Sequence, residues 1–115
     1  MLNINLEFRK GILFVRLSGE LTKKTVNLLK KEVTTLIKAN GIRHVVYNMN
    51  NLNAIDLAGI SNLYYNYELV QNNHGQTLMC GIKNVLIQER IERSRLLHYI
   101  LEISDELKAF QIIKT

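Results

Sequence analysis

The sequence predicts an α/β fold: a mixed, mainly parallel β-sheet of about five strands, with about four helices. Two observations support this prediction. Short β-branched runs alternate with longer segments whose apolar residues recur every three or four positions. Glycine-containing breaks such as Asn40-Gly41 and His74-Gly75 separate them. The expected order is β, β, α, β, α, β, α, β, α, and helical connections of this kind join parallel strands.

The first forty residues predict a hairpin followed by a helix. Apolar and polar residues alternate over residues 2–8, Lys10-Gly11 interrupts the pattern, and β-branched and aromatic residues resume it over residues 12–17. Beyond Gly19, Thr22 is the expected N-cap of a helix that ends at Asn40-Gly41. One face of this helix should pack on the sheet.

The middle of the chain predicts a central strand and a second helix. Residues 43–48 form a short β-rich run of the kind found in buried parallel strands. Residues 49–55 are mostly polar and predict a loop. Asp56 then follows as a good N-cap for a helix that continues to His74-Gly75.

The remaining residues predict two further strand and helix pairs. Residues 77–82 should form a buried strand, and residues 85–93 a third helix. A short strand is expected at His98–Leu101, and a closing helix over Ser104–Ile113, opened by a serine or aspartate cap.

Composition favours one cytoplasmic domain. A chain of 115 residues with 47% hydrophobic and 22% charged residues has the size and balance of a single globular domain, residues 1–115. No apolar run is long enough to cross a membrane, and the alternating N-terminus does not resemble a signal peptide. The lone cysteine, Cys80, lies in an apolar run and is expected to be a buried thiol.

Charge does not predict nucleic-acid binding, although the formal net charge is +5. The lysines of residues 23–38 are spread along the first predicted helix, and the arginines of residues 90–95 alternate with glutamates. Solvated helix faces account for both groups, and no strand interleaves aromatic with basic residues as a stacking platform requires. An acidic protein partner is compatible with the same surplus.

No catalytic, metal or cofactor signature is visible in the sequence. The six glycines are scattered, so no phosphate-binding loop is predicted. His44 and His98 fall in predicted strands and His74 in a turn, without neighbouring ligands for a metal. The stretch Gly59–Leu63 lacks the second glycine of a nucleophile elbow. The chain is therefore expected to be a binding protein that is not an enzyme and needs no cofactor.

Two segments resemble the STAS domains of bacterial anti-sigma-factor antagonists. One is the Leu17–Thr22 turn with its Gly-Glu-Leu sequence, and the other runs from Asn48 through Asn51-Leu52 into Ile55–Gly59. In that family a strand leads through a short Asp-containing loop into the second helix. The serine or threonine just before the loop glycine is phosphorylated by a cognate kinase. The likeness spans nearly the whole chain and implies the STAS fold.

The resemblance places specific residues in the family's phosphorylation loop. Asp56 matches the family aspartate and Gly59 the family glycine, so Ala58 occupies the phosphoacceptor position. Ala58 has no hydroxyl group. Leu57 replaces a residue that is usually small, and Ser61 stands where a glycine is frequent. The resemblance therefore implies the family interface without its usual phosphorylation.

The implied function is that of an anti-sigma-factor antagonist. Such a protein binds an anti-sigma factor, which resembles a histidine-kinase-like ATPase in this family, and so frees a sigma factor. The loss of the acceptor at Ala58 implies binding that phosphorylation does not reverse. Two alternatives stay open: an adaptor or scaffold subunit, as in stress-signalling complexes or lipid-transport ABC systems, and a small-ligand or nucleotide sensor at the Asp56 helix N-terminus.

The residues expected to bind a partner surround the start of the second helix. They are Glu20, Thr22, Asp56, Leu57, Ala58, Gly59, Ser61 and Tyr65. Several have simpler explanations as well: Asp56 could act only as a helix cap, and Gly59 could permit close backbone packing. Ser61 is a displaced phosphoacceptor or an ordinary helix residue. Tyr65 joins Leu57 in an exposed apolar patch or is only partly buried.

Overall fold

The protein contains a five-stranded mixed sheet, as predicted. The computed structural model describes residues 1–114, and Thr115 lies outside the described residues. The strands are β1 (Leu2–Arg9), β2 (Ile12–Leu21), β3 (His44–Ile55), β4 (Gln76–Cys80) and β5 (Leu101–Ile103). They lie side by side in sequence order. Strand β1 is antiparallel to β2, and all later pairs are parallel.

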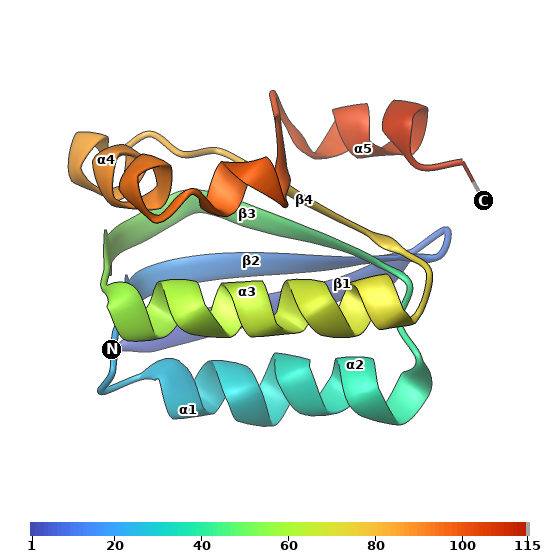
Figure 1. Cartoon of the computed structure of the whole chain (residues 1–115), viewed down its shortest axis with the longest axis horizontal. Coiled ribbons are helices and arrows are strands. Elements are labelled where there is room, and N and C mark those ends of the chain that lie inside the picture. The colour runs from blue at the N-terminus through green and yellow to red at the C-terminus, as the bar shows by residue number, and fades with distance from the viewer. Residues whose placement is uncertain (115) are drawn as a thin grey trace.

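The helices follow the predicted order. They are α1 (Val26–Leu29), α2 (Thr35–Asn40), α3 (Leu57–Asn72), α4 (Val85–Ser94) and α5 (Glu106–Ile112), with a π-helical turn η1 (Lys30–Thr34) and a 3-10 turn η2 (Leu96–His98). Figure 1 shows that α1, η1 and α2 form one continuous helical rod lying alongside α3. The predicted first helix is thus one rod. It ends at Gly41, which adopts the left-handed conformation that favours glycine.

The two faces of the sheet are covered unequally. The larger core joins one face to the rod, α3, α4 and η2, and includes Val15, Tyr47, Leu63 and Ile91. The smaller core lies on the other face and is closed by α5 alone. The α3 and α4 helices therefore lie on the same side of the sheet, and a surface can form where they meet.

A charged cluster fixes α5 to the sheet. The Arg16 guanidinium donates through Nε and Nη2 to the two carboxylate oxygens of Glu106, each at 2.8 Å. Nη2 also donates to Glu7, and the Asn48 amide donates to Glu106, both at 2.8 Å. The hydrogen bonds from Arg16 hold the pKa of Glu106 below its usual value. This bidentate geometry makes the contact directional.

Two strands are longer than the sequence pattern indicated. Strand β2 continues beyond residue 17 to Leu21, and the expected polar loop over residues 49–55 is the second half of β3. The backbone pairs Gly19 with Leu52 and Leu21 with Ile55. The prediction was wrong here because the exposed asparagines make the segment look like a loop, while its backbone bonds to β2.

Two further predicted boundaries were wrong, and both lie at turns. Thr22 is not the N-cap of the first helix, because its carbonyl accepts the N–H groups of Thr25 and Val26 in a turn that precedes α1. His98 lies in η2, and the strand expected at His98–Leu101 begins three residues later. In contrast, Asp56 caps α3 and Cys80 is buried in β4, as predicted. Among the described residues, no helix is long and apolar enough to cross a membrane.

Candidate functional site

The N-terminus of α3 lies against the turn that joins β2 to α1. One carboxylate oxygen of Asp56 accepts the Gly59 N–H at 3.0 Å, and the other accepts the Lys23 N–H at 2.9 Å. The Asp56 N–H donates to the carbonyl of Leu21 at 3.2 Å. Asp56 therefore caps the helix and also joins it to a loop 33 residues earlier in the chain.

The pKa of Asp56 lies below its ordinary value of 3.8. Desolvation is the largest single influence and raises the pKa. The backbone N–H groups of Lys23, Gly59 and Ala58 together outweigh it, with help from the positive charge of Lys23. The carboxylate is therefore held in its charged form at neutral pH. Its negative charge interacts favourably with the positive N-terminal end of the helix dipole.

The Asp56→Ala variant is expected to lose about 1–2 kcal/mol of unfolding free energy at pH 7, because a capping acceptor and the link to Lys23 disappear together. A carboxyl group whose pKa is lower in the folded than in the unfolded protein stabilises the fold at pH values above its unfolded-state pKa. This stabilisation is lost as the pH falls through the folded-state pKa. The difference in unfolding free energy between wild type and Asp56→Ala should therefore shrink as the pH is lowered from 7 to below the ordinary value of 3.8, as measured by urea unfolding.

Asp105→Ala is the matched control for this prediction, since Asp105 caps α5 through one N–H, that of Lys108 at 3.0 Å. The Asp105→Ala substitution should lower the free energy of unfolding by less than Asp56→Ala does. Equal costs, or a deficit at Asp56 that does not change with pH, would contradict the assigned role.

Gly59 is buried because the chain packs directly against it. A Cβ atom at this position would lie 2.6 Å from the Leu21 carbonyl oxygen and 2.7 Å from the Leu21 side chain. The close backbone approach considered from the sequence is therefore present, and it comes from β2 of the same chain. Gly59 lets the end of β2 and the start of α3 meet. Direct contact of Gly59 with a partner stays a prediction.

The first two residues of α3 reach the surface. Leu57 is 75% exposed, and Ala58 is partly exposed. A leucine side chain that is three-quarters exposed gains little stability from burial, because the stabilisation scales with the apolar area removed from water. Leu57 and Ala58 are therefore available for contact with another molecule.

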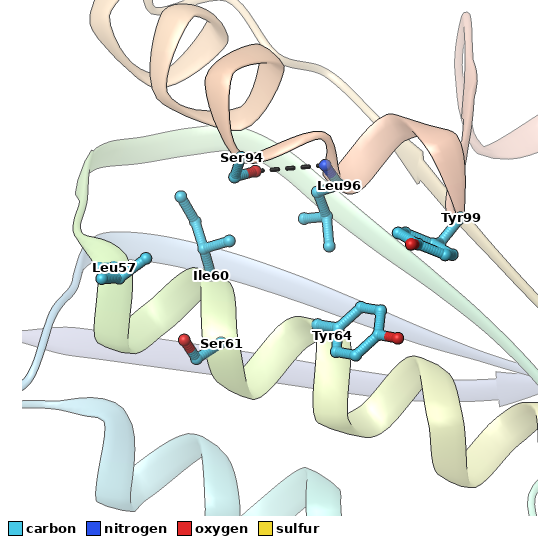
Figure 2. A pocket seen from close by; sticks show the side chains of 7 residues that line it. All are labelled: Leu57, Ile60, Ser61, Tyr64, Ser94, Leu96 and Tyr99. Atoms are coloured by element: carbon cyan, nitrogen blue, oxygen red, sulfur yellow. Dashed lines mark hydrogen bonds between the residues drawn. The ribbon is translucent and has the colours of Figure 1, made fainter.

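A groove runs along α3 away from this end. Figure 2 shows Ile60 and Tyr64 of α3 facing Ser94, Leu96 and Tyr99, and Leu57 and Ser61 complete the lining. The hollow has a volume of about 390 Å³. The Tyr64 and Tyr99 rings meet edge to face, with centroids 5.1 Å apart, and close the far end. The spacing of the α3 residues, every three or four positions, places them on one side of the helix.

The other predicted partner-binding residues are distributed around this site. Thr22 lies in the turn beside Asp56, and Ser61 is exposed one helical turn after Leu57. Glu20 is exposed at the end of β2, where it forms a weak ion pair with the N-terminal amino group at 3.7 Å. Tyr65 is 42% exposed, but its ring lies next to the Lys38 ammonium at 5.3 Å, on the side of α2. The groove therefore joins Leu57 to Tyr64 and Tyr99 rather than to Tyr65.

Across residues 1–114, no three His, Cys, Asp or Glu side chains lie close enough to hold a metal ion. Burial raises the pKa of the Cys80 thiol to about 11, so the thiol is protonated and unreactive at neutral pH. The exposed features are an apolar helix start, a capped helix N-terminus and a groove, and these are suited to binding.

The sequence profile of the STAS domain matches residues 3–110. This chain belongs to the STAS domain family. A curated relative from Paenibacillus polymyxa, named "Anti-sigma F factor antagonist", is 30% identical over 81 residues, which cover 70% of this chain and 69% of the relative. The resemblance inferred from the two sequence segments is thereby confirmed.

Solved STAS structures share the fold at low sequence identity. A putative anti-sigma factor antagonist from Thermotoga maritima superposes with a TM-score of 0.88 at 12% identity, covering 97% of this chain and 95% of that one. The Bacillus cell fate determinant SpoIIAA in its phosphorylated form gives a TM-score of 0.75 at 17% identity, covering 96% of this chain and all of that one. The STAS fold predicted from the sequence is confirmed.

Sequence reasoning missed half of the groove. Leu96 and Tyr99 reach it from η2 and the residue after it, more than thirty positions after Tyr64 in the chain. No local sequence pattern predicts that contact. The signal that was available is the spacing of Leu57, Ile60 and Tyr64, which marked one side of α3 without saying what faces it.

Proposed function

We propose that this STAS domain is an anti-sigma-factor antagonist. It binds an anti-sigma factor, an ATPase of kinase-like fold. The binding surface is formed by the start of α3 and by the adjoining turn around Lys23, which joins β2 to α1. Binding releases the sigma factor that the anti-sigma factor holds. The observation that carries the proposal is the exposed Leu57 next to the partly exposed Ala58 on a capped helix start, at the position where the family presents its phosphoacceptor.

The proposed interaction is not reversed by phosphorylation at the usual position. A phosphate adds about −1.5 to −2 charge, which a helix N-terminus tolerates but a neutral protein interface does not. Ala58 has no oxygen to accept a phosphoryl group. An antagonist built this way stays active whenever it is present, and its activity is set by its concentration.

An adaptor or scaffold role is the second candidate, and it is favoured by the same missing hydroxyl. A STAS subunit of a stress-signalling complex or of a lipid-transport ABC system would use its surface for permanent assembly and would need no switch. The two candidate functions differ in the protein that is bound: an anti-sigma factor for the antagonist, and a transporter or scaffold subunit for the adaptor.

Affinity capture from a lysate of the source organism separates these functions. The purified protein should retain an ATPase of the anti-sigma-factor class, identified by mass spectrometry. A Leu57→Asp bait should lose it, while Lys31→Glu, an exposed change on the helical rod, should keep it. Recovery of a transporter ATPase or of a multi-copy scaffold instead would overturn the antagonist proposal in favour of the adaptor.

A further inference from the structure

The groove beside α3 extends beyond the part drawn in Figure 2. A second hollow of about 360 Å³ is lined by Leu57, Ile60, Arg90, Arg93 and Ser94. It shares three of these residues with the first hollow, so the two form one continuous channel. We call this channel the α3–α4 groove. It is apolar at the tyrosine end and basic at the end nearest the start of α3.

The described residues neutralise the basic end only weakly. The Arg90 guanidinium donates to the carbonyl of Ile55 at 2.9 Å, and no carboxylate of residues 1–114 forms an ion pair with it. Arg93 is 83% exposed and lies 3.9 Å from Glu89, a distance and exposure at which an ion pair contributes little. None of the described residues that line the α3–α4 groove is acidic.

Helical geometry explains why the two arginines share a side of α4. Arg90, Arg93 and Ser94 are three and four positions apart, which places them together on the flank toward α3. Glu92 projects from a different side, where it accepts a hydrogen bond from Gln88 at 3.2 Å. Arg90 and Arg93 therefore line the groove, whereas Glu89 lies beside Arg93 at 3.9 Å but outside the groove lining.

We propose that the α3–α4 groove binds an acidic, amphipathic helix of a protein partner. Apolar side chains of that helix cover Leu57, Ile60 and Tyr64, and a carboxylate at one end pairs with Arg93. Leu57 and Tyr64 are seven residues apart, or about 10 Å along α3, which matches two turns of an incoming helix. The inference rests on the proposed function in one respect: the anti-sigma factor is the partner that would supply the helix.

Selection from a phage library of random peptides, each about 16 residues long or four helical turns, tests the groove without the anti-sigma factor. Immobilised wild-type protein should enrich peptides that carry apolar residues every three or four positions together with Asp or Glu. The enriched peptide is then synthesised, and its affinity is measured by fluorescence anisotropy. Leu57→Asp and Arg93→Glu should each weaken binding at least about fivefold, while Lys31→Glu leaves it unchanged.

Three results would overturn the groove proposal: no enriched motif, a neutral or basic motif, or a peptide that binds both groove variants as tightly as wild type. The proposed function fails separately. If affinity capture recovers no anti-sigma factor while acidic peptides still bind the groove, the function is wrong and the groove stands. If an anti-sigma factor is captured equally by wild type and Arg93→Glu and the library yields no motif, the function stands without the groove.

Discussion

Replacing Ala58 by aspartate is expected to weaken binding to the anti-sigma factor at least about 30-fold without unfolding the domain. The new carboxylate imitates part of the charge of a phosphate in the middle of the proposed interface. Placing an unpaired charge in an interface costs about 2 kcal/mol or more. The fold tolerates the change because position 58 is partly exposed and lies in the first turn of α3, where the helix dipole favours a negative charge.

Ala58→Ser is the matched control for this substitution. A serine is nearly the size of alanine and uncharged, so the affinity, measured by isothermal titration calorimetry, should stay within about twofold of wild type. The same variant restores the acceptor hydroxyl and should become phosphorylated by a kinase-active partner. If Ala58→Asp binds as tightly as Ala58→Ser, the start of α3 is outside the interface.

Replacing Gly75 by alanine is expected to lower the unfolding free energy by about 3 kcal/mol, the largest stability effect of any prediction made for this chain. A Cβ atom at Gly75 would lie 1.4 Å from the Arg43 carbonyl oxygen and 2.3 Å from the Arg43 carbonyl carbon. That oxygen also accepts the Gln76 N–H at 2.9 Å, where β4 begins beside β3. The extra methyl group must therefore push apart two backbone segments at the entry to the sheet.

Gly41→Ala provides the comparison, because Gly41 has a positive φ of 59° but no atom within 4 Å of an added Cβ. Its cost should be about 1 kcal/mol, arising from the backbone conformation alone. Urea unfolding monitored by circular dichroism measures both variants. If Gly75→Ala costs no more than Gly41→Ala, close backbone packing is not what requires Gly75.

Much of this fold could be predicted from the sequence because local signals and tertiary packing agree. Asp56 is an N-cap by residue type and by hydrogen bonding, and Gly41 ends a helix where Asn40-Gly41 predicted a stop. The second half of β3 could not be predicted. Its asparagines face outward, and its strand conformation depends on backbone pairing with β2, which leaves no mark on residue type.

The candidate site also contains residues that could be predicted from the sequence and residues that could not. Asp56, Leu57 and Ala58 could be placed at the candidate site because they are consecutive and align with a family motif, in which Asp56 keeps the family's residue type while Leu57 and Ala58 do not. Arg93 could not be assigned, since its charge looked like part of a solvated helix until α4 was placed against α3. The sequence left two alternatives open for Tyr65 for a related reason: helical spacing shows which residues share a side, whereas the packing of α2 places the Tyr65 ring beside the Lys38 ammonium.

The most direct test of the account is to mix the purified protein with the anti-sigma factor recovered by capture and excess ATP. The complex is followed by size-exclusion chromatography, and the protein by intact mass spectrometry. The account predicts a complex that persists with ATP and a mass without added phosphate, while Ala58→Ser gains a phosphate and dissociates. Failure of the wild-type protein to form a complex, or its stoichiometric phosphorylation and release, would contradict the central claim.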